Sequence, residues 1–150
     1  MHPTVLLVDD DPHVTTALAR ALHEAPFSVQ FCASGHDALA MLARAPVHVL
    51  IANEKMPGMS GSELLAVVRR RYPETIRIML TGQLHEATVP ATRDGDAHRF
   101  FVKPLDVDEL SRAISEALAT QAQQPPVLRT PPAVETSPPR RRRSKSRPAD

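Results

Sequence analysis

Short apolar runs recur five times along this chain and constrain its fold more than any other feature. They lie at residues 5–8, 27–32, 47–52, 76–81 and 99–102, and between them apolar residues recur at helical spacing. Strands that alternate with helices pair in parallel, and a parallel sheet is covered by helices on both of its faces. The sequence therefore predicts an α/β fold with a five-stranded parallel sheet.

Composition divides the chain into two parts. Residues 1–120 carry 11 Lys and Arg against 15 Asp and Glu, whereas residues 121–150 carry 7 against 2 and hold 7 of the 15 prolines. About 120 residues is a common domain size, and a proline-rich basic segment with few large apolar side chains cannot build a core. We predict one acidic domain, 1–120, followed by a disordered basic tail, 121–150.

Capping residues and prolines mark where the helices are expected to begin and end. Ser34 can cap one helix, a second is expected to begin at Ser62, and Asp106 is placed to cap the last. A helix is also expected within residues 84–95, but Pro90 would lie in its middle, which is costly in a helix interior. That helix is therefore predicted to be short.

Nothing in the sequence indicates a membrane or a secreted protein. No apolar run approaches the length of a membrane span, and the N-terminal residues lack the basic region and long apolar stretch that are typical of a signal peptide. The single cysteine, Cys32, cannot form an internal disulfide, and its apolar surroundings predict a small core residue. We expect a soluble cytoplasmic protein.

Polar residues follow four of the five apolar runs. Asp9 and Asp10 follow the first, Asn53 the third, and Thr81 ends the fourth, while Lys103 follows the fifth. In open parallel sheets, ligands bind at the carboxyl ends of the strands. The sequence therefore predicts a polar cluster at this edge that binds an ion or an anion.

Four short motifs extend this pattern and resemble those of bacterial response-regulator receiver domains. They are Val8-Asp9-Asp10, Met56-Pro57-Gly58-Met59-Ser60-Gly61, Leu80-Thr81-Gly82 and Phe100-Phe101-Val102-Lys103-Pro104. Each is weak alone, but their order and spacing together are specific, and the resemblance covers residues 4–120. It implies a flavodoxin-like (βα)5 fold with strand order 2-1-3-4-5.

The resemblance also implies a site for Mg²⁺. In receivers an acidic pair, the phosphoacceptor aspartate and a backbone carbonyl two residues further on hold the metal, and Mg²⁺ prefers such oxygen ligands. Here Asp9 and Asp10 match the pair and Lys55 supplies the carbonyl, but Asn53 stands at the phosphoacceptor position. One anionic ligand is then a neutral amide, so we expect Mg²⁺ to bind only weakly.

Three further residues match the family's switch. Thr81 matches the hydroxyl residue that binds a phosphoryl oxygen, and Lys103 matches the lysine that pairs with the phosphoryl group. Lys103 precedes a proline whose peptide bond is typically cis in the family, and Phe100 matches the aromatic residue that turns inward on activation. With Asn53 present, Lys103 could instead hold the Asn53 carbonyl or Asp10.

The asparagine has three competing explanations. The chain is a natural pseudo-receiver, an engineered non-phosphorylatable variant, or a receiver phosphorylated at another carboxylate. Glu54 is a poor substitute acceptor, because neighbouring residues of a strand point to opposite faces, and Asp10 is a better candidate. An amide lacks the anionic oxygen that attacks phosphorus, so we do not expect this chain to be an enzyme.

We interpret the chain as a stand-alone, atypical response regulator that acts by protein–protein interaction in two-component or phosphorelay signalling. Its expected partner is a sensor histidine kinase or another signalling protein, and a homodimer could form through the 84–120 face. The alternative is a nucleic-acid-associated adaptor, in which the tail contacts phosphates of a nucleic acid or an anionic surface. The basic residues of that segment are Arg140, Arg141, Arg142, Arg143, Lys145 and Arg147.

Overall fold

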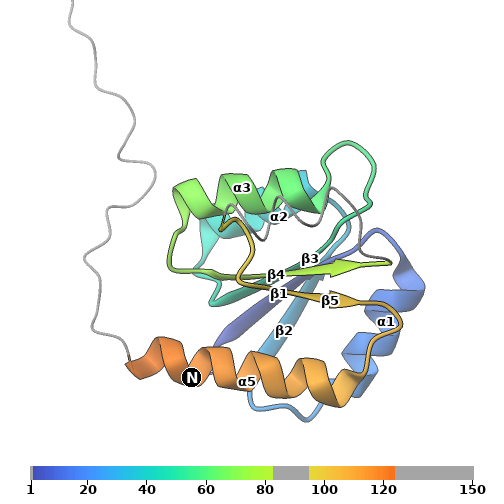
Figure 1. Cartoon of the computed structure of the whole chain (residues 1–150), viewed down its shortest axis with the longest axis vertical. Coiled ribbons are helices and arrows are strands. Elements are labelled where there is room, and N and C mark those ends of the chain that lie inside the picture. Colours follow the sequence, from blue (N-terminus) through green and yellow to red (C-terminus); the bar gives the residue numbers. More distant parts are fainter. Residues whose placement is uncertain (1, 83–94, 124–150) are drawn as a thin grey trace, which may run out of the picture.

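A computed structural model describes residues 2–82 and 95–123 and shows one parallel sheet between two layers of helices (Figure 1). The strands are β1 (Thr4–Val8), β2 (Ser28–Cys32), β3 (Val49–Asn53), β4 (Ile76–Thr81) and β5 (Arg99–Val102). The helices are α1 (Pro12–Ala21), α2 (Gly35–Arg44), α3 (Gly61–Arg71) and α5 (Val107–Gln123). The strand order is β2-β1-β3-β4-β5, so the predicted fold and strand order are confirmed.

The two central strands are buried on both faces, and this divides the core into two halves. Helices α1 and α5 cover one face of the sheet, and α2 and α3 cover the other. Against α1 and α5 lie Val5, Leu7, Val49 and Ile51. Against α2 and α3 lie Leu6, Val8, Leu50 and Ala52. Each Val, Leu or Ile side chain among them contributes about 1.5–3 kcal/mol by leaving water, and this burial holds β1 and β3 in register at the centre of the sheet.

Side-chain caps set the start of the helices. Ser34 accepts a hydrogen bond from the Asp37 N–H, and Asp106 accepts from the N–H groups of the first turn of α5, as predicted. Helix α3 begins one residue earlier than expected, at Gly61, because Ser60 and Glu63 form a capping box. The sequence Ser-x-x-Glu was the signal for this start.

Some expected features lie outside the described residues. These are residues 84–94 with Pro90, where the short helix and the first part of the 84–120 face were expected, and the tail beyond residue 123. Helix α5 continues to Gln123, three residues past the predicted domain boundary. Among the helices the structure describes, none is both long enough and apolar enough to cross a membrane.

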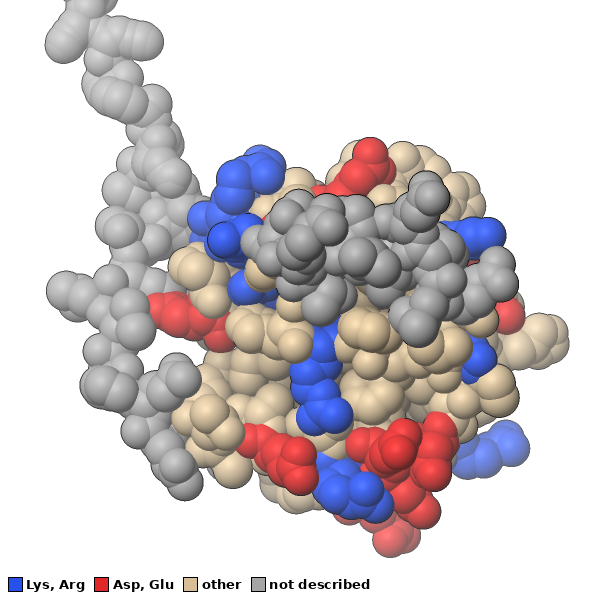
Figure 2. Space-filling view, in the orientation of Figure 1, with Lys and Arg blue, Asp and Glu red and all other residues tan. Residues whose placement is uncertain are grey.

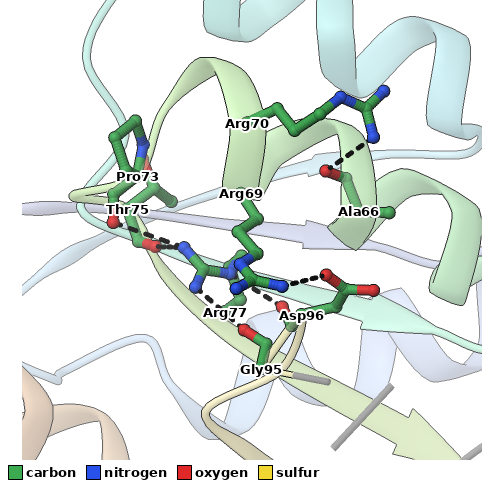
Figure 3. A network of polar contacts seen from close by, with 8 residues as sticks. All are labelled: Ala66, Arg69, Arg70, Pro73, Thr75, Arg77, Gly95 and Asp96. Carbon is green, nitrogen blue, oxygen red and sulfur yellow. Dashed lines mark hydrogen bonds and ion pairs between the residues drawn. The ribbon is translucent and has the colours of Figure 1, made fainter. Parts of the chain in front are cut away.

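A buried arginine fastens the start of β5 to the sheet. The Arg77 guanidinium donates hydrogen bonds to four backbone carbonyls, those of Pro73, Thr75, Gly95 and Asp96, at 2.7–3.3 Å (Figure 3). Burial lowers the pKa of Arg77 and the neighbouring charge of Arg69 lowers it further, but a guanidinium stays charged in proteins. Because each carbonyl accepts a charge-assisted bond, the segment that enters β5 is held in place.

Two histidines also join neighbouring strands, through imidazole nitrogens that accept backbone N–H groups. The His98 Nδ1 accepts a hydrogen bond from the Arg77 backbone N–H at 3.0 Å, and the His98 backbone N–H donates to the Arg77 carbonyl at 2.8 Å. The His48 Nδ1 accepts from the Thr4 backbone N–H at 3.1 Å. An imidazole nitrogen accepts only when it carries no proton. Partial burial and the charge of Arg77 lower the pKa of His98 below its ordinary value of about 6.5.

Acid should therefore weaken the start of β5. The folded state favours neutral His98, so its contribution to stability is complete above about pH 6.5 and is lost as the pH falls toward the lower pKa of the folded state. His98→Asn keeps an acceptor that does not titrate, and it should reduce the loss of Tm between about pH 7 and pH 5. Thermal melts of His36→Gln, at an exposed histidine, are the control and should match the unaltered chain. Equal pH profiles for all three proteins would contradict this role of His98.

Candidate functional site

The carboxyl ends of the central strands bring the predicted polar residues together. Asp9 follows β1, Asn53 ends β3 and Thr81 ends β4, and all three are buried. Asp10, beside Asp9, is exposed. The parallel pairing of β1 with β3 and of β3 with β4 places these strand ends next to one another, so a shared polar site is a consequence of the topology.

Lys103 closes the site from the end of β5. Its ammonium lies 3.0 Å from Asn53 Oδ1 and 3.4 Å from Asp9 Oδ2. Its backbone N–H donates to the Thr81 carbonyl at 2.8 Å, and the following Lys103–Pro104 peptide bond is cis, as the resemblance implied. The expected contact between Lys103 and the Asn53 carbonyl is present, whereas the carboxylate that it reaches is Asp9 and not Asp10.

The Asn53 amide is engaged at both ends. Its oxygen accepts from Lys103, and its Nδ2 donates to the Lys55 backbone carbonyl at 2.8 Å. A carboxylate at this position would offer no proton to that carbonyl. The amide therefore links β3, the following turn and β5 into one hydrogen-bonded chain.

These residues fit Mg²⁺ poorly. The Lys55 carbonyl already accepts from Asn53, and the buried Asp9 accepts the Asp11 N–H at 2.9 Å while its other oxygen faces Lys103. Of the three expected ligands, Asp10 alone has its ligand oxygens outside these contacts, and its side chain is exposed. Within residues 2–82 and 95–123, no group of three or more His, Cys, Asp or Glu side chains is placed to hold a metal. The polar site is satisfied by its own donors and acceptors.

Glu54 turns away from this site and caps the next helix. Its buried carboxylate accepts from the Ser62 N–H at 2.9 Å and from the Ser62 hydroxyl at 2.6 Å. A carboxylate at the first turn of a helix is stabilised by the helix dipole. The Gly61 N–H also donates to the Glu54 carbonyl, and a Cβ on Gly61 would collide with the backbone oxygen of Asn53. This close approach of α3 to β3 requires glycine.

Of the remaining predicted residues, the structure describes Phe100, Thr81 and Cys32 but not the basic residues of the tail. Phe100 is partly buried and packs against the core below α2 and α3, and Thr81 is almost fully buried. Cys32 is half-buried, and burial raises the pKa of its thiol to about 11, consistent with an unreactive core residue. The arginines and the lysine predicted to bind anions at 140–147 lie outside the described residues.

Sequence reasoning missed the contacts that position the site from outside. Ser62 bonds Glu54 across a turn of eight residues, and Arg77 reaches the Gly95 and Asp96 carbonyls 18 and 19 residues away. A charged residue inside an apolar strand, as Arg77 is in Ile-Arg-Ile-Met-Leu, was the available signal for a buried polar network.

Comparison with known proteins identifies the family. The model of the response regulator receiver domain matches residues 5–115. With the parallel sheet and the polar cluster at its carboxyl edge, this match shows that the chain belongs to the response regulator receiver domain family. Receivers are the signalling domains of two-component systems, and they typically bind Mg²⁺ at their phosphorylation site.

Named relatives are transcriptional regulators. The chain is 34% identical to the hydrogenase transcriptional regulatory protein HoxA of Cupriavidus necator over 91% of this chain and 28% of HoxA. It is 35% identical to the DNA-binding transcriptional regulator NtrC of Salmonella typhimurium over 81% of this chain and 26% of NtrC. The chain thus spans about a quarter of the length of these relatives.

Solved receiver structures share the fold. The signal receiver domain of an HD domain-containing protein from Pseudomonas fluorescens Pf-5 aligns with a TM-score of 0.76 at 34% identity, over 81% of this chain and 90% of that chain. The chemotaxis protein CheY4 of Vibrio cholerae aligns with a TM-score of 0.72 at 28% identity, over 78% of this chain and 99% of that chain.

Removing the Lys103 ammonium should destabilise the domain. Lys103→Met leaves the buried Asp9 carboxylate and the Asn53 oxygen without their shared donor, and we expect a loss of about 1–3 kcal/mol in the free energy of unfolding, since Lys103 is 28% exposed. Lys55→Met is the matched control, because its side chain is exposed at the same edge. Urea denaturation of both variants measures the difference, and similar losses for both would exclude a special role for Lys103.

Proposed function

We propose that this chain is an atypical receiver that signals without phosphorylation, with Asn53 standing at the phosphoacceptor position. The observation that carries the proposal is the position of Asn53 at the end of β3, between the Lys103 ammonium and the Lys55 carbonyl. An aspartate there would face the same lysine and the same acidic neighbour. Asp9 and Lys103, which surround Asn53, are therefore arranged as neighbours of a phosphoacceptor position.

The chemistry of the amide supports this proposal. A phosphoacceptor must present an anionic oxygen in line with the phosphorus atom, and positioning and charge stabilisation then supply most of the catalysis. The Asn53 oxygen is uncharged and already accepts a hydrogen bond from Lys103. The Lys55 carbonyl, which would bind Mg²⁺ in a receiver, already accepts a hydrogen bond from the Asn53 amide. The chain would therefore not catalyse its own phosphorylation and would not act as an enzyme.

Signalling would then depend on binding. In the proposed state Lys103 is held by Asn53 and Asp9, so the end of β5 has one arrangement that no phosphoryl group alters. A partner would recognise this fixed surface, and a sensor histidine kinase or another cytoplasmic signalling protein is the expected class. That this receiver stands alone stays a prediction of the sequence.

Another carboxylate remains the competing explanation. Glu54 is a poor acceptor because its carboxylate is buried against Ser62 at the start of α3. Asp9 is buried and faces Lys103, which leaves exposed Asp10 as the best placed substitute. Phosphorylation of this chain, if it occurs, should depend on Asp10.

Intact mass spectrometry after incubation with acetyl phosphate and Mg²⁺ tests the proposal. The unaltered chain should keep its mass, because no carboxylate stands at the acceptor position. Asn53→Asp should gain the mass of one phosphoryl group, because it restores an anionic oxygen beside Lys103.

Two results would count against the proposal. If the unaltered chain gains a phosphoryl group, it is a working receiver, and loss of that mass in Asp10→Asn would locate the acceptor. If Asn53→Asp also stays unmodified while remaining folded by circular dichroism, Asn53 is not the residue that silences the site.

A further inference from the structure

Charge is separated between the two edges of the sheet. At the carboxyl edge, nine carboxylates outnumber three cations among the described residues; the carboxylates are Asp9, Asp10, Asp11, Asp37, Glu54, Glu63, Asp106, Asp108 and Glu109. At the amino edge, seven arginines outnumber four carboxylates; they are Arg20, Arg44, Arg69, Arg70, Arg71, Arg77 and Arg99. Figure 2 shows basic side chains grouped at the upper left, where α3 ends, and acidic ones at the lower right, where α5 begins.

Four arginines of the amino edge have no acidic partner among the described residues. Arg69 pairs with Asp96 at 3.2 Å and Arg77 is enclosed by carbonyls. By contrast, Arg20, Arg44, Arg70 and Arg71 are exposed and form no ion pair with any residue in the described ranges. Arg20 lies on α1, on the opposite face of the sheet from the other three. We call Arg44, Arg70 and Arg71 the basic edge. Helices α2 and α3, which carry it, pack on the same face of the sheet (Figure 1).

The helix dipole accounts for only part of this charge. Cations near a helix C-terminus are worth typically 0.3–1 kcal/mol, and the effect is confined to the last turn. Helix α3 already has Arg69 in its last turn, and Arg70 also donates weakly to the Ala66 carbonyl at 3.4 Å. Two further exposed arginines without counter-ions exceed what the dipole requires.

The end of α5 lies beside the basic edge. The Gln121 side-chain amide donates to the Glu74 carbonyl at 2.7 Å, and Glu74 lies in the connection between α3 and β4, three residues after Arg71. The sequence that follows Gln123 carries seven Lys and Arg against two Asp and Glu. The fold thus places the last turn of α5, which precedes this basic sequence, near the exposed arginines of α3.

We propose that the basic edge binds the phosphate backbone of a nucleic acid, so that the folded domain itself contacts the polyanion. Arginine suits phosphate because its planar guanidinium binds two oxygens at once. A lipid surface is disfavoured, because membrane-binding faces combine cations with exposed aromatic or leucine side chains. Among the described residues the exposed large apolar side chain is Val102, at the opposite edge.

This inference goes beyond the proposed function and does not depend on Asn53. The binding needs no base contacts, so it would be independent of sequence and strongly dependent on salt. Acidic side chains at the carboxyl edge would repel the same polyanion, so the domain would meet it with its amino edge.

Fluorescence anisotropy of a short DNA duplex of random sequence, titrated with the full chain at several salt concentrations, tests the proposal. Arg70→Ala/Arg71→Ala removes two phosphate contacts, so the slope of log K against log salt should fall by about 1.8 and the affinity by roughly tenfold or more. Arg20→Ala/Arg112→Ala removes the same charge from exposed positions on α1 and α5, which cover the opposite face of the sheet from the basic edge, and it should leave the slope unchanged. Circular dichroism confirms that each variant is folded.

Three outcomes would overturn the proposal. Equal weakening by the two double variants would mean that only net charge matters. A full chain whose DNA binding is abolished by changing Arg140–Arg143 to Gln, but is untouched by Arg70→Ala/Arg71→Ala, would place all binding after the domain. Binding to vesicles of anionic lipid but not to the duplex would assign the basic edge to a membrane.

Discussion

The ammonium group of Lys103 is the interaction on which the polar site depends. It lies between the Asn53 oxygen and the buried Asp9 carboxylate, and it joins the end of β5 to the ends of β3 and β1. A buried carboxylate without a cation would carry a large desolvation cost. Asn53 completes the arrangement, because its amide proton satisfies the Lys55 carbonyl. A neutral side chain thereby connects groups that a receiver with aspartate would share with a metal ion.

The sheet supplies the rigid frame that makes these short contacts possible. Burial of both faces of β1 and β3 fixes their register, and the register sets where Asp9 and Asn53 emerge. Gly61 lets the start of α3 approach the Asn53 backbone, and Arg77 fixes the opposite end of β4 to the segment before β5. Lys103 is thus positioned through β5 by contacts at the far edge of the sheet.

Much of this arrangement could be predicted from the sequence, because it follows from local patterns. Apolar runs located the strands, and the polar residues after them located the site. The partners of individual atoms could not be predicted in full. That Asn53 donates to Lys55, that Lys103 reaches Asp9 rather than Asp10, and that Glu54 bonds Ser62 depend on side-chain directions across strands and turns. The Ser60–Glu63 capping box was visible in the sequence, and the prediction overlooked it.

The most direct test of the account is the side-chain amide of Asn53, which is the only asparagine in the chain. Selective 15N-asparagine labelling therefore gives a single pair of side-chain NMR signals in the full chain. The account predicts one slowly exchanging amide proton, bound to the Lys55 carbonyl, whose chemical shift does not move when Mg²⁺ is added. A rapidly exchanging amide whose signals shift with Mg²⁺ would show that the site opens to metal, and it would contradict the closed arrangement of Asn53 and Lys103.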